Sequence, residues 1–143
     1  MAAADTAEIT YAVNDKPSVD EFIDVLVSST LAERRPVEDH ACIAGMLKNA
    51  NLVVTARYEK KLIGIARSIT DFHYACYLSD IAVDRTYQNN GIGKQLIAHT
   101  QQQLGTRCKL ILLSAPGAAD YYPKTGFSQH PGAWVLSEGQ SLK

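Results

Sequence analysis

The sequence has almost no net charge, since 14 Lys and Arg side chains balance 15 Asp and Glu side chains across 143 residues. Proteins dedicated to nucleic acids normally carry a clustered basic excess. The balance therefore argues against a dedicated nucleic-acid binder, although it leaves room for a local basic patch. The 46% hydrophobic content excludes disorder for the body of the chain, because disordered chains combine low hydrophobicity with high net charge.

Long hydrophobic runs are also missing. The longest are a few residues, such as Leu110–Leu113, far below the ~20 apolar residues that a membrane-spanning helix needs. The first residues, Met1 to Asp5, carry neither the basic nor the apolar stretch of a secretory signal peptide. We therefore expect a cytoplasmic protein that binds no membrane.

Cysteine is scarce. Cys42, Cys76 and Cys108 are odd in number and widely spaced, which fits neither a disulfide framework nor a zinc knuckle. Buried, reduced thiols are the simplest interpretation, and no metal site is expected.

The apolar pattern predicts a single domain over residues 1–143, with flexible ends at 1–7 and 138–143. A chain of this length can bury its own core. Strands are expected at 8–13, 52–58, 62–70, 74–83 and 109–114, with one or two more within 127–136. Ser18 and Glu21 have the spacing of a capping box, so a helix is expected after Ser18. Further helices are expected after Pro36, at 91–104 and at 118–124. The apolar run at 109–114 is typical of a central strand buried on both faces.

The most informative segment is a strand followed by a loop with two glycines, Gly91 and Gly93, at the start of a helix. Backbone N–H groups at a helix start lack intrahelical acceptors, and the helix dipole favours an anion there. The segment therefore suits a pyrophosphate, although a flexible turn has the same composition. Neither the dinucleotide-binding fingerprint nor the P-loop fits, because Leu96, Gln88 and Gln95 stand where those motifs need other residues.

Gln88-Asn89-Asn90-Gly91-Ile92-Gly93 matches the [QR]-x-x-G-x-[GA] signature of the GCN5-related N-acetyltransferases (GNAT). The later segment Tyr121–Phe127 resembles a second motif of that family, and the element order agrees along most of the chain. The resemblance implies a GNAT fold: a mixed α/β, mostly antiparallel sheet of about six to seven strands with about four helices and splayed central strands.

The resemblance also implies a site for acetyl-CoA as co-substrate, without a metal. The pyrophosphate would bind the backbone N–H groups of 89–94, with Gln88 opening the loop. The pantetheine chain would lie along the strand end, and the Val83 N–H would face the thioester oxygen. The cofactor-binding residues expected on this basis are Ile81, Ala82, Val83, Gln88, Asn89, Asn90, Gly91, Ile92, Gly93, Lys94 and Tyr122.

Two residues are the catalytic candidates. Tyr122 stands where many members of the family keep a tyrosine that protonates the leaving sulfur, and Tyr121 is expected to pack in the core. Asp80 interrupts an apolar strand, and a buried carboxylate needs a partner or marks a site. Asp80 is therefore either the group that binds or deprotonates the amine, directly or through water, or a hydrogen-bonding partner within the fold.

Weaker candidates lie in loops and near the C-terminus. Arg34 and Arg35 border the acceptor site of the resembled family, but two arginines beside a proline are also typical of a solvated turn. His73 and His130 are expected in loops, either as solvated side chains or as titratable groups near the acceptor pocket. His99 is expected on the solvent side of its helix. Trp134 is expected to pack against the last strand or to form an aromatic wall of the acceptor pocket.

Together these features predict an N-acetyltransferase that moves the acetyl group of acetyl-CoA to a primary amine of a small molecule by direct attack. The alternatives are a protein or peptide N-acetyltransferase and a non-catalytic acyl-CoA-binding module. No nucleic-acid partner is expected, and the resemblance leaves a homodimer open.

Overall fold

The computed structural model describes residues 8–143, which form two compact units, one ending at Leu113 and the other comprising Ser114–Lys143. The expected flexible end at 1–7 lies outside the described residues. Residues 138–143 are exposed and carry no helix or strand. The assignment of residues 1–143 to a single domain stays a prediction, because the described residues divide into two units that are each compact.

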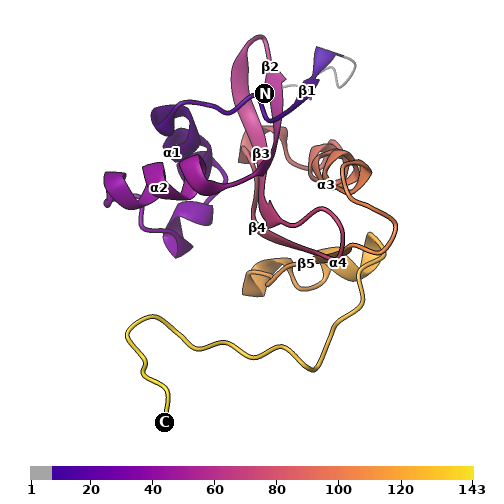
Figure 1. The fold of residues 1–143 in the computed structure, drawn as a ribbon. Helices are drawn as coiled ribbons and strands as arrows, with labels where there is room; N and C mark the ends of the chain where they lie inside the picture. The colour runs from indigo at the N-terminus through magenta and orange to yellow at the C-terminus, as the bar shows by residue number, and fades with distance from the viewer. Residues whose placement is uncertain (1–7) are drawn as a thin grey trace. The chain divides into compact units, whose positions relative to one another are not determined.

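The first unit is a five-stranded sheet with the strand order β1-β2-β3-β4-β5. Strands β1 to β4 are antiparallel to their neighbours, and β5 runs parallel to β4. Figure 1 shows α1 and α2 on one side of this sheet and α3 on the other. The strands are β1 (Thr10–Val13), β2 (Leu52–Tyr58), β3 (Lys61–Thr70), β4 (Ala75–Val83) and β5 (Lys109–Ile111). The helices are α1 (Val19–Ser28), the 3-10 turn η2 (Leu31–Arg34), α2 (His40–Asn49), the 3-10 turn η3 (Arg85–Tyr87) and α3 (Ile92–Gln102).

Helix α1 begins at the capping box that the sequence predicts. The Ser18 hydroxyl accepts the Glu21 N–H at 3.1 Å, and the Glu21 carboxylate accepts the Ser18 N–H at 3.0 Å. Glu21 also pairs with Arg57 of β2 at 2.5 Å. The cap therefore satisfies two donors at the helix start and ties α1 to the sheet.

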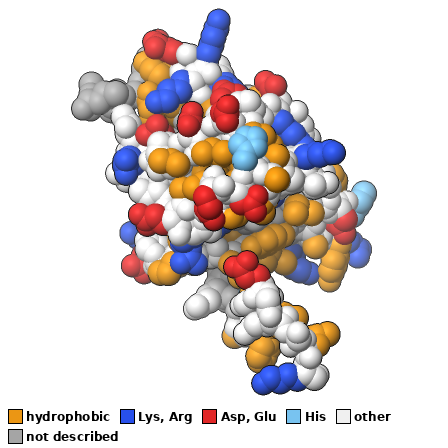
Figure 2. Space-filling view, turned by 90° about the vertical axis from the view of Figure 1, so that its left-hand side faces the viewer, with side chains coloured by type: hydrophobic (Ala, Val, Ile, Leu, Met, Phe, Trp, Pro, Cys, Tyr) orange, Lys and Arg blue, Asp and Glu red, His pale blue; other side chains and the backbone are white. Residues whose placement is uncertain are grey.

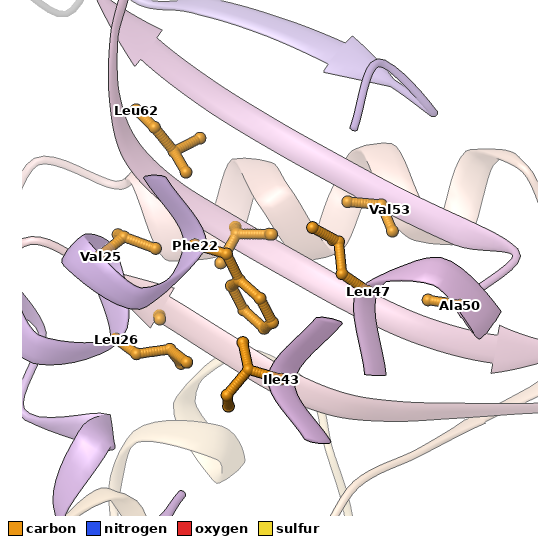
Figure 3. Close-up of a cluster of buried hydrophobic side chains, with 10 residues drawn as sticks. Phe22, Val25, Leu26, Ile43, Leu47, Ala50, Val53 and Leu62 are labelled. Carbon is orange, nitrogen blue, oxygen red and sulfur yellow. The ribbon is translucent and has the colours of Figure 1, made fainter. Parts of the chain in front are cut away.

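A cluster of buried apolar side chains joins α1 and α2 to the sheet (Figure 3). Phe22 of α1 lies at its centre and is fully buried. Its other members are Val25, Leu26, Ile43, Leu47, Ala50, Val53, Leu62, Ile65 and Ala82. Ala82 belongs to β4, so this core fixes the strand that carries the candidate site.

The last strands differ from the prediction. The sheet has five strands instead of about six to seven, because no strand forms within 127–136. Pro131 lacks an N–H for a ladder, and the Gly132 N–H donates to the His130 ring within a local turn. Trp134 is accordingly 93% exposed instead of packing against a last strand.

The prediction that 109–114 forms a central buried strand was also wrong. Strand β5 has only three residues and is the edge of the described sheet. Ile111 and Leu113 are exposed as a result. The second unit contains the 3-10 turn η4 (Pro116–Ala118) and the short helix α4 (Tyr121–Lys124), in the place of the single helix expected at 118–124.

Surface charge follows the composition. On the face drawn in Figure 2, acidic and basic side chains alternate among apolar ones, without a patch of one sign. Within residues 8–143, no helix is long and apolar enough to cross a membrane.

Replacing Phe22 by Ala is expected to lower the free energy of unfolding by about 3–5 kcal/mol, because a large buried ring leaves a cavity between α1, α2 and the sheet. Val27 lies on the same helix but is 52% exposed, so Val27→Ala should change stability by less than about 0.5 kcal/mol. Urea denaturation of both variants checks this, and equal effects would contradict the packing described here.

Candidate functional site

The edge of β4 that faces away from β3 is mostly unpaired. Strand β5 pairs with β4 only from Ala75–Lys109 to Tyr77–Ile111. The Asp84 N–H donates to the Ile63 carbonyl of β3 at 2.8 Å. Because successive N–H groups of a strand alternate between its two edges, those of Val83 and Ile81 point to the open edge. Two backbone donors are therefore left without a strand partner among the described residues.

The loop after β4 is held by its own polar side chains. Asp84 accepts the Thr86 N–H at 2.9 Å, and Gln88 donates its amide to the Val83 carbonyl at 3.0 Å. The Asn90 amide donates to the Tyr87 carbonyl at 2.9 Å and also to the Gln88 carbonyl. These short-range bonds give the loop a fixed course from the end of β4 to the start of α3.

Helix α3 begins without a capping side chain. Its N-cap, Gly91, has φ 77°, a left-handed conformation that disfavours side chains. The first bond inside the helix runs from the Gln95 N–H to the Gly91 carbonyl. The N–H groups of Ile92, Gly93 and Lys94 therefore have no intrahelical acceptor. Free donors and the positive end of the helix dipole suit an anion at this point.

Asp80 lies in β4 and is enclosed by two arginines. One carboxylate oxygen accepts the Arg35 Nε at 2.6 Å, and the other accepts the Arg67 Nε. The Asp80 side chain is 0% exposed, against 5% for Arg67 and 21% for Arg35. Both oxygens are thus bound to guanidinium groups. Of the two roles left open for Asp80 by the sequence, these contacts support the hydrogen-bonding one.

Arg67 is the site residue that sequence reasoning missed. It stands within the apolar run of β3, as Asp80 does in β4, and the two residues are direct neighbours across the strands. When each of two adjacent apolar strands contains one charged residue, the two charges are expected to pair with each other. A lone buried charge would lower the stability of the fold. The sequence contains that signal, but it becomes clear only once the register is known.

Tyr122 belongs to the second unit. Its ring contacts Phe127 edge-on at a centroid distance of 5.6 Å, and burial, with a smaller contribution from Tyr121, raises the pKa of its phenol. The expectation that Tyr121 packs in the core was wrong, because Tyr121 is 40% exposed. Neighbouring helical residues point about 100° apart, so only one of the pair faces inward.

The remaining candidates show few polar contacts. Arg34, His73 and His130 are exposed, and the Arg34 side chain makes no hydrogen bond or ion pair with the described residues. His99 is not fully solvated, because its ring stacks on Tyr11 with centroids 4.9 Å apart. A hollow lined by Glu8, Thr10, Arg57, Glu59 and Lys60 contains none of the expected site residues. In the described part of the chain, no three His, Cys, Asp or Glu side chains gather as a metal site would require. The expectation of buried thiols was wrong for Cys42, which is exposed, whereas Cys76 is buried and Cys108 is half-buried.

A comparison with models of protein families shows to which family the chain belongs. The family model described as acetyltransferase (GNAT) domain matches residues 24–141. The chain belongs to the GNAT acetyltransferase family. The open edge of β4 and the loop before α3 are therefore parts of a GNAT domain, in agreement with the resemblance of the Gln88–Gly93 segment.

Similar proteins support the same family. GCN5-related N-acetyltransferase 2, chloroplastic, from Arabidopsis thaliana is 35% identical over 78 residues, which are 51% of this chain and 29% of that protein. Histone acetyltransferase TAP1 from Glycine max is 29% identical over 111 residues, 68% of this chain and 47% of that protein. The chain thus spans about a third to a half of the length of these relatives.

A solved structure shows the same fold. The aminoglycoside N-acetyltransferase AAC(6')-Iy in complex with CoA superimposes with a TM-score of 0.70 at 18% identity, and the match covers 92% of this chain and 95% of that one.

The positive φ of Gly91 gives a prediction about stability. Space is open around a Cβ at this residue, so only backbone strain opposes Gly91→Ala, which should cost about 1–2 kcal/mol. Gly45 in α2 also has open space but no positive φ. Gly45→Ala should therefore stabilise the protein by up to about 1 kcal/mol. Thermal unfolding of the two variants checks the signs, and a Gly91→Ala protein as stable as the parent would contradict the left-handed cap.

Proposed function

We propose that this GNAT domain transfers the acetyl group of acetyl-CoA to a primary amine. The observation that supports this most is the succession of open backbone donors, which begins with Ile81 and Val83 on β4 and continues at the first turn of α3. Such donors suit a ligand with an amide-containing chain and a pyrophosphate. Gln88, whose amide binds the Val83 carbonyl, connects the two parts.

The proposed contacts follow from the chemistry of each segment. The N–H groups of residues 89–94 bind the pyrophosphate, where the missing side chain of Gly91 leaves the backbone accessible. Ile81, Ala82 and Val83 accompany the pantetheine chain. The Val83 N–H faces the thioester oxygen, where a fixed donor stabilises the negative charge that develops during attack. Lys94 is exposed and adds a positive charge at the same helix start.

The proposed reaction is direct attack in a ternary complex. An alkyl ammonium has a pKa near ~10.4, so the amine must lose its proton before its nitrogen bonds to the acetyl carbon. The C–S bond then breaks, and the thiolate takes up a proton that we assign to the Tyr122 hydroxyl. The second proton that leaves the attacking nitrogen restores this hydroxyl through solvent. A tyrosine phenol has a pKa of about 10, and burial raises the pKa of Tyr122 further. The phenol is therefore protonated at neutral pH, as a proton donor requires.

Asp80 enters this proposal as part of the support of the catalytic strand. Its oxygens are bound to Arg35 and Arg67, so the base that takes the amine proton is assigned to solvent within the site. In this proposal Asp80 is needed for the geometry of β4, but it does not accept the proton of the amine.

A small molecule is the proposed acceptor. Helices α1 and α2 are joined by residues 29–39, and Arg35 of this segment binds the Ser79 carbonyl of β4. A segment held in this way is less able to adapt to a large substrate. The structural neighbour described above is named as an aminoglycoside N-acetyltransferase, and an aminoglycoside is a small molecule. The relative TAP1 is named as a histone acetyltransferase, and a histone is a protein. A protein acceptor is therefore the alternative that the assay must include.

The compartment and assembly stay proposals that rest on the sequence. We propose a cytoplasmic location and leave a homodimer open, while the first relative is a chloroplastic protein. Fractionation of cells that produce the full chain decides the former.

The proposed activity is tested by incubating the protein with acetyl-CoA and a panel of amines while free thiol is measured. Thiol release with at least one small amine is expected, and Gly91→Arg should abolish it, because the large side chain at a left-handed cap blocks the loop. Acetylation of a protein substrate that small amines do not inhibit would replace the small acceptor. Saturable CoA binding without thiol release from any acceptor would indicate a non-catalytic module.

Tyr122→Phe tests the proton donor. Removal of the hydroxyl should lower kcat about 10²-fold or more and leave KM for acetyl-CoA nearly unchanged, because the ring still packs against Phe127. Tyr121→Phe is the matched control and should retain the parent kcat. If Tyr122→Phe has the kcat of the parent, another group protonates the sulfur.

A further inference from the structure

Strand β4 contains a bulge at the point where it separates from β5. Arg67 pairs with Asp80 and Ser68 pairs with Leu78, so Ser79 has no partner on β3. The last pair between β4 and β5 is Tyr77–Ile111. The carbonyl of Ser79 therefore lies in a part of the strand where neither neighbour offers a regular ladder.

Two arginines bind the polar groups of the bulged residue. The Arg35 Nη2 donates to the Ser79 carbonyl at 2.8 Å, and the Arg67 Nη2 donates to the Ser79 hydroxyl at 3.0 Å. Through their Nε atoms the same guanidinium groups bind the two oxygens of Asp80. Each arginine thus contacts both bulge residues, a geometry that suits the planar fork of a guanidinium.

The two arginines differ in their place in the fold. Arg67 is buried and belongs to β3, next to Asp80 in the sheet, and its Nη1 also donates to the Met46 carbonyl of α2. Arg35 is partly exposed and comes from the segment between η2 and α2. Loss of Arg67 would leave one oxygen of the buried Asp80 carboxylate unpaired and remove the bond to α2, which endangers folding. Loss of Arg35 leaves the Arg67–Asp80 pair in place.

The bulge sets which way the following N–H groups point. Because successive residues of a strand alternate in the face to which the side chain points and in the edge to which the N–H points, a slip of one residue exchanges both. In the present register Ile81 and Val83 direct their N–H groups to the open edge. A bulge that shifted or relaxed would turn them toward β3 or move them out of line.

We infer that Arg35 is a positioning residue, which holds the Ser79–Asp80 bulge so that the backbone donors of Ile81 and Val83 stay aimed at the open edge of β4. It acts through Ser79 and Asp80 and does not touch the reacting atoms. The inference rests on the proposed function, because it gives those two donors a catalytic purpose.

The test compares Arg35→Gln, Arg35→Lys and the control Arg34→Gln. Arg34 is the adjacent, exposed arginine, and among residues 8–143 its side chain has no partner, so Arg34→Gln removes the same charge without touching the bulge. Arg35→Gln should lower kcat about 10- to 100-fold, as expected for a small misplacement of a catalytic group. Arg35→Lys keeps the charge beside Asp80, but one ammonium cannot reproduce the fork to Ser79.

The Lys variant separates positioning from stability. We expect Arg35→Lys to keep the Tm of the parent and still lose several-fold in kcat, with Arg34→Gln unchanged in both. If Arg35→Lys and Arg35→Gln have the kcat of Arg34→Gln, or if kcat falls only in proportion to Tm, Arg35 is not a positioning residue.

A readout without turnover distinguishes this inference from the proposed function. Hydrogen exchange of the Ala82 and Asp84 amides, which point to β3 in the present register, should be faster in Arg35→Gln and unchanged in Arg34→Gln, as measured by NMR. If the parent protein acetylates no amine, the proposed function fails, while altered exchange would still show that Arg35 orders the strand. Identical exchange in both variants would overturn the inference whatever the activity.

Discussion

The short pairing between β4 and β5 is the constraint on which the rest of the site depends. Only three residue pairs join the two strands, so most of one edge of β4 has no strand partner in the described sheet. Backbone N–H groups are strong donors that are seldom left unpaired when buried. An edge of this kind, continued by the uncapped start of α3, is prepared for a ligand that carries its own acceptors along its length.

Keeping such an edge open requires that the strand be held from its other side. The apolar cluster around Phe22 and Ala82 fixes β4 from the face covered by α1 and α2, and β3 pairs with it along its length. The charges of Asp80, Arg35 and Arg67 lie at the one irregular point of the strand. Replacing a buried group of charges by apolar residues is often neutral for stability. The presence of these three charged residues is therefore better explained by their effect on the geometry of β4 than by a gain in stability.

Local sequence patterns predicted the features that depend on neighbouring residues. The capping box at Ser18, the strands on either side of the 59–60 turn, and the glycine loop before α3 all depend on short-range chemistry, and the fold class and family are confirmed. The edge position of β5 could not be predicted, because Leu110–Leu113 is as apolar as a central strand and only its pairing distinguishes the two. The same limit applies to Asp80, whose partners lie 13 and 45 positions away along the chain.

The central claim is that one ligand occupies the open edge of β4 and the start of α3 together. Backbone amide NMR during titration with acetyl-CoA tests it most directly, because each donor reports separately. The account predicts the largest shift changes at Ile81, Val83 and the amides of residues 89–94, all with one binding curve. Changes confined to other residues, such as those of the hollow at Glu8 and Lys60, or different curves for the strand and the loop, would contradict it.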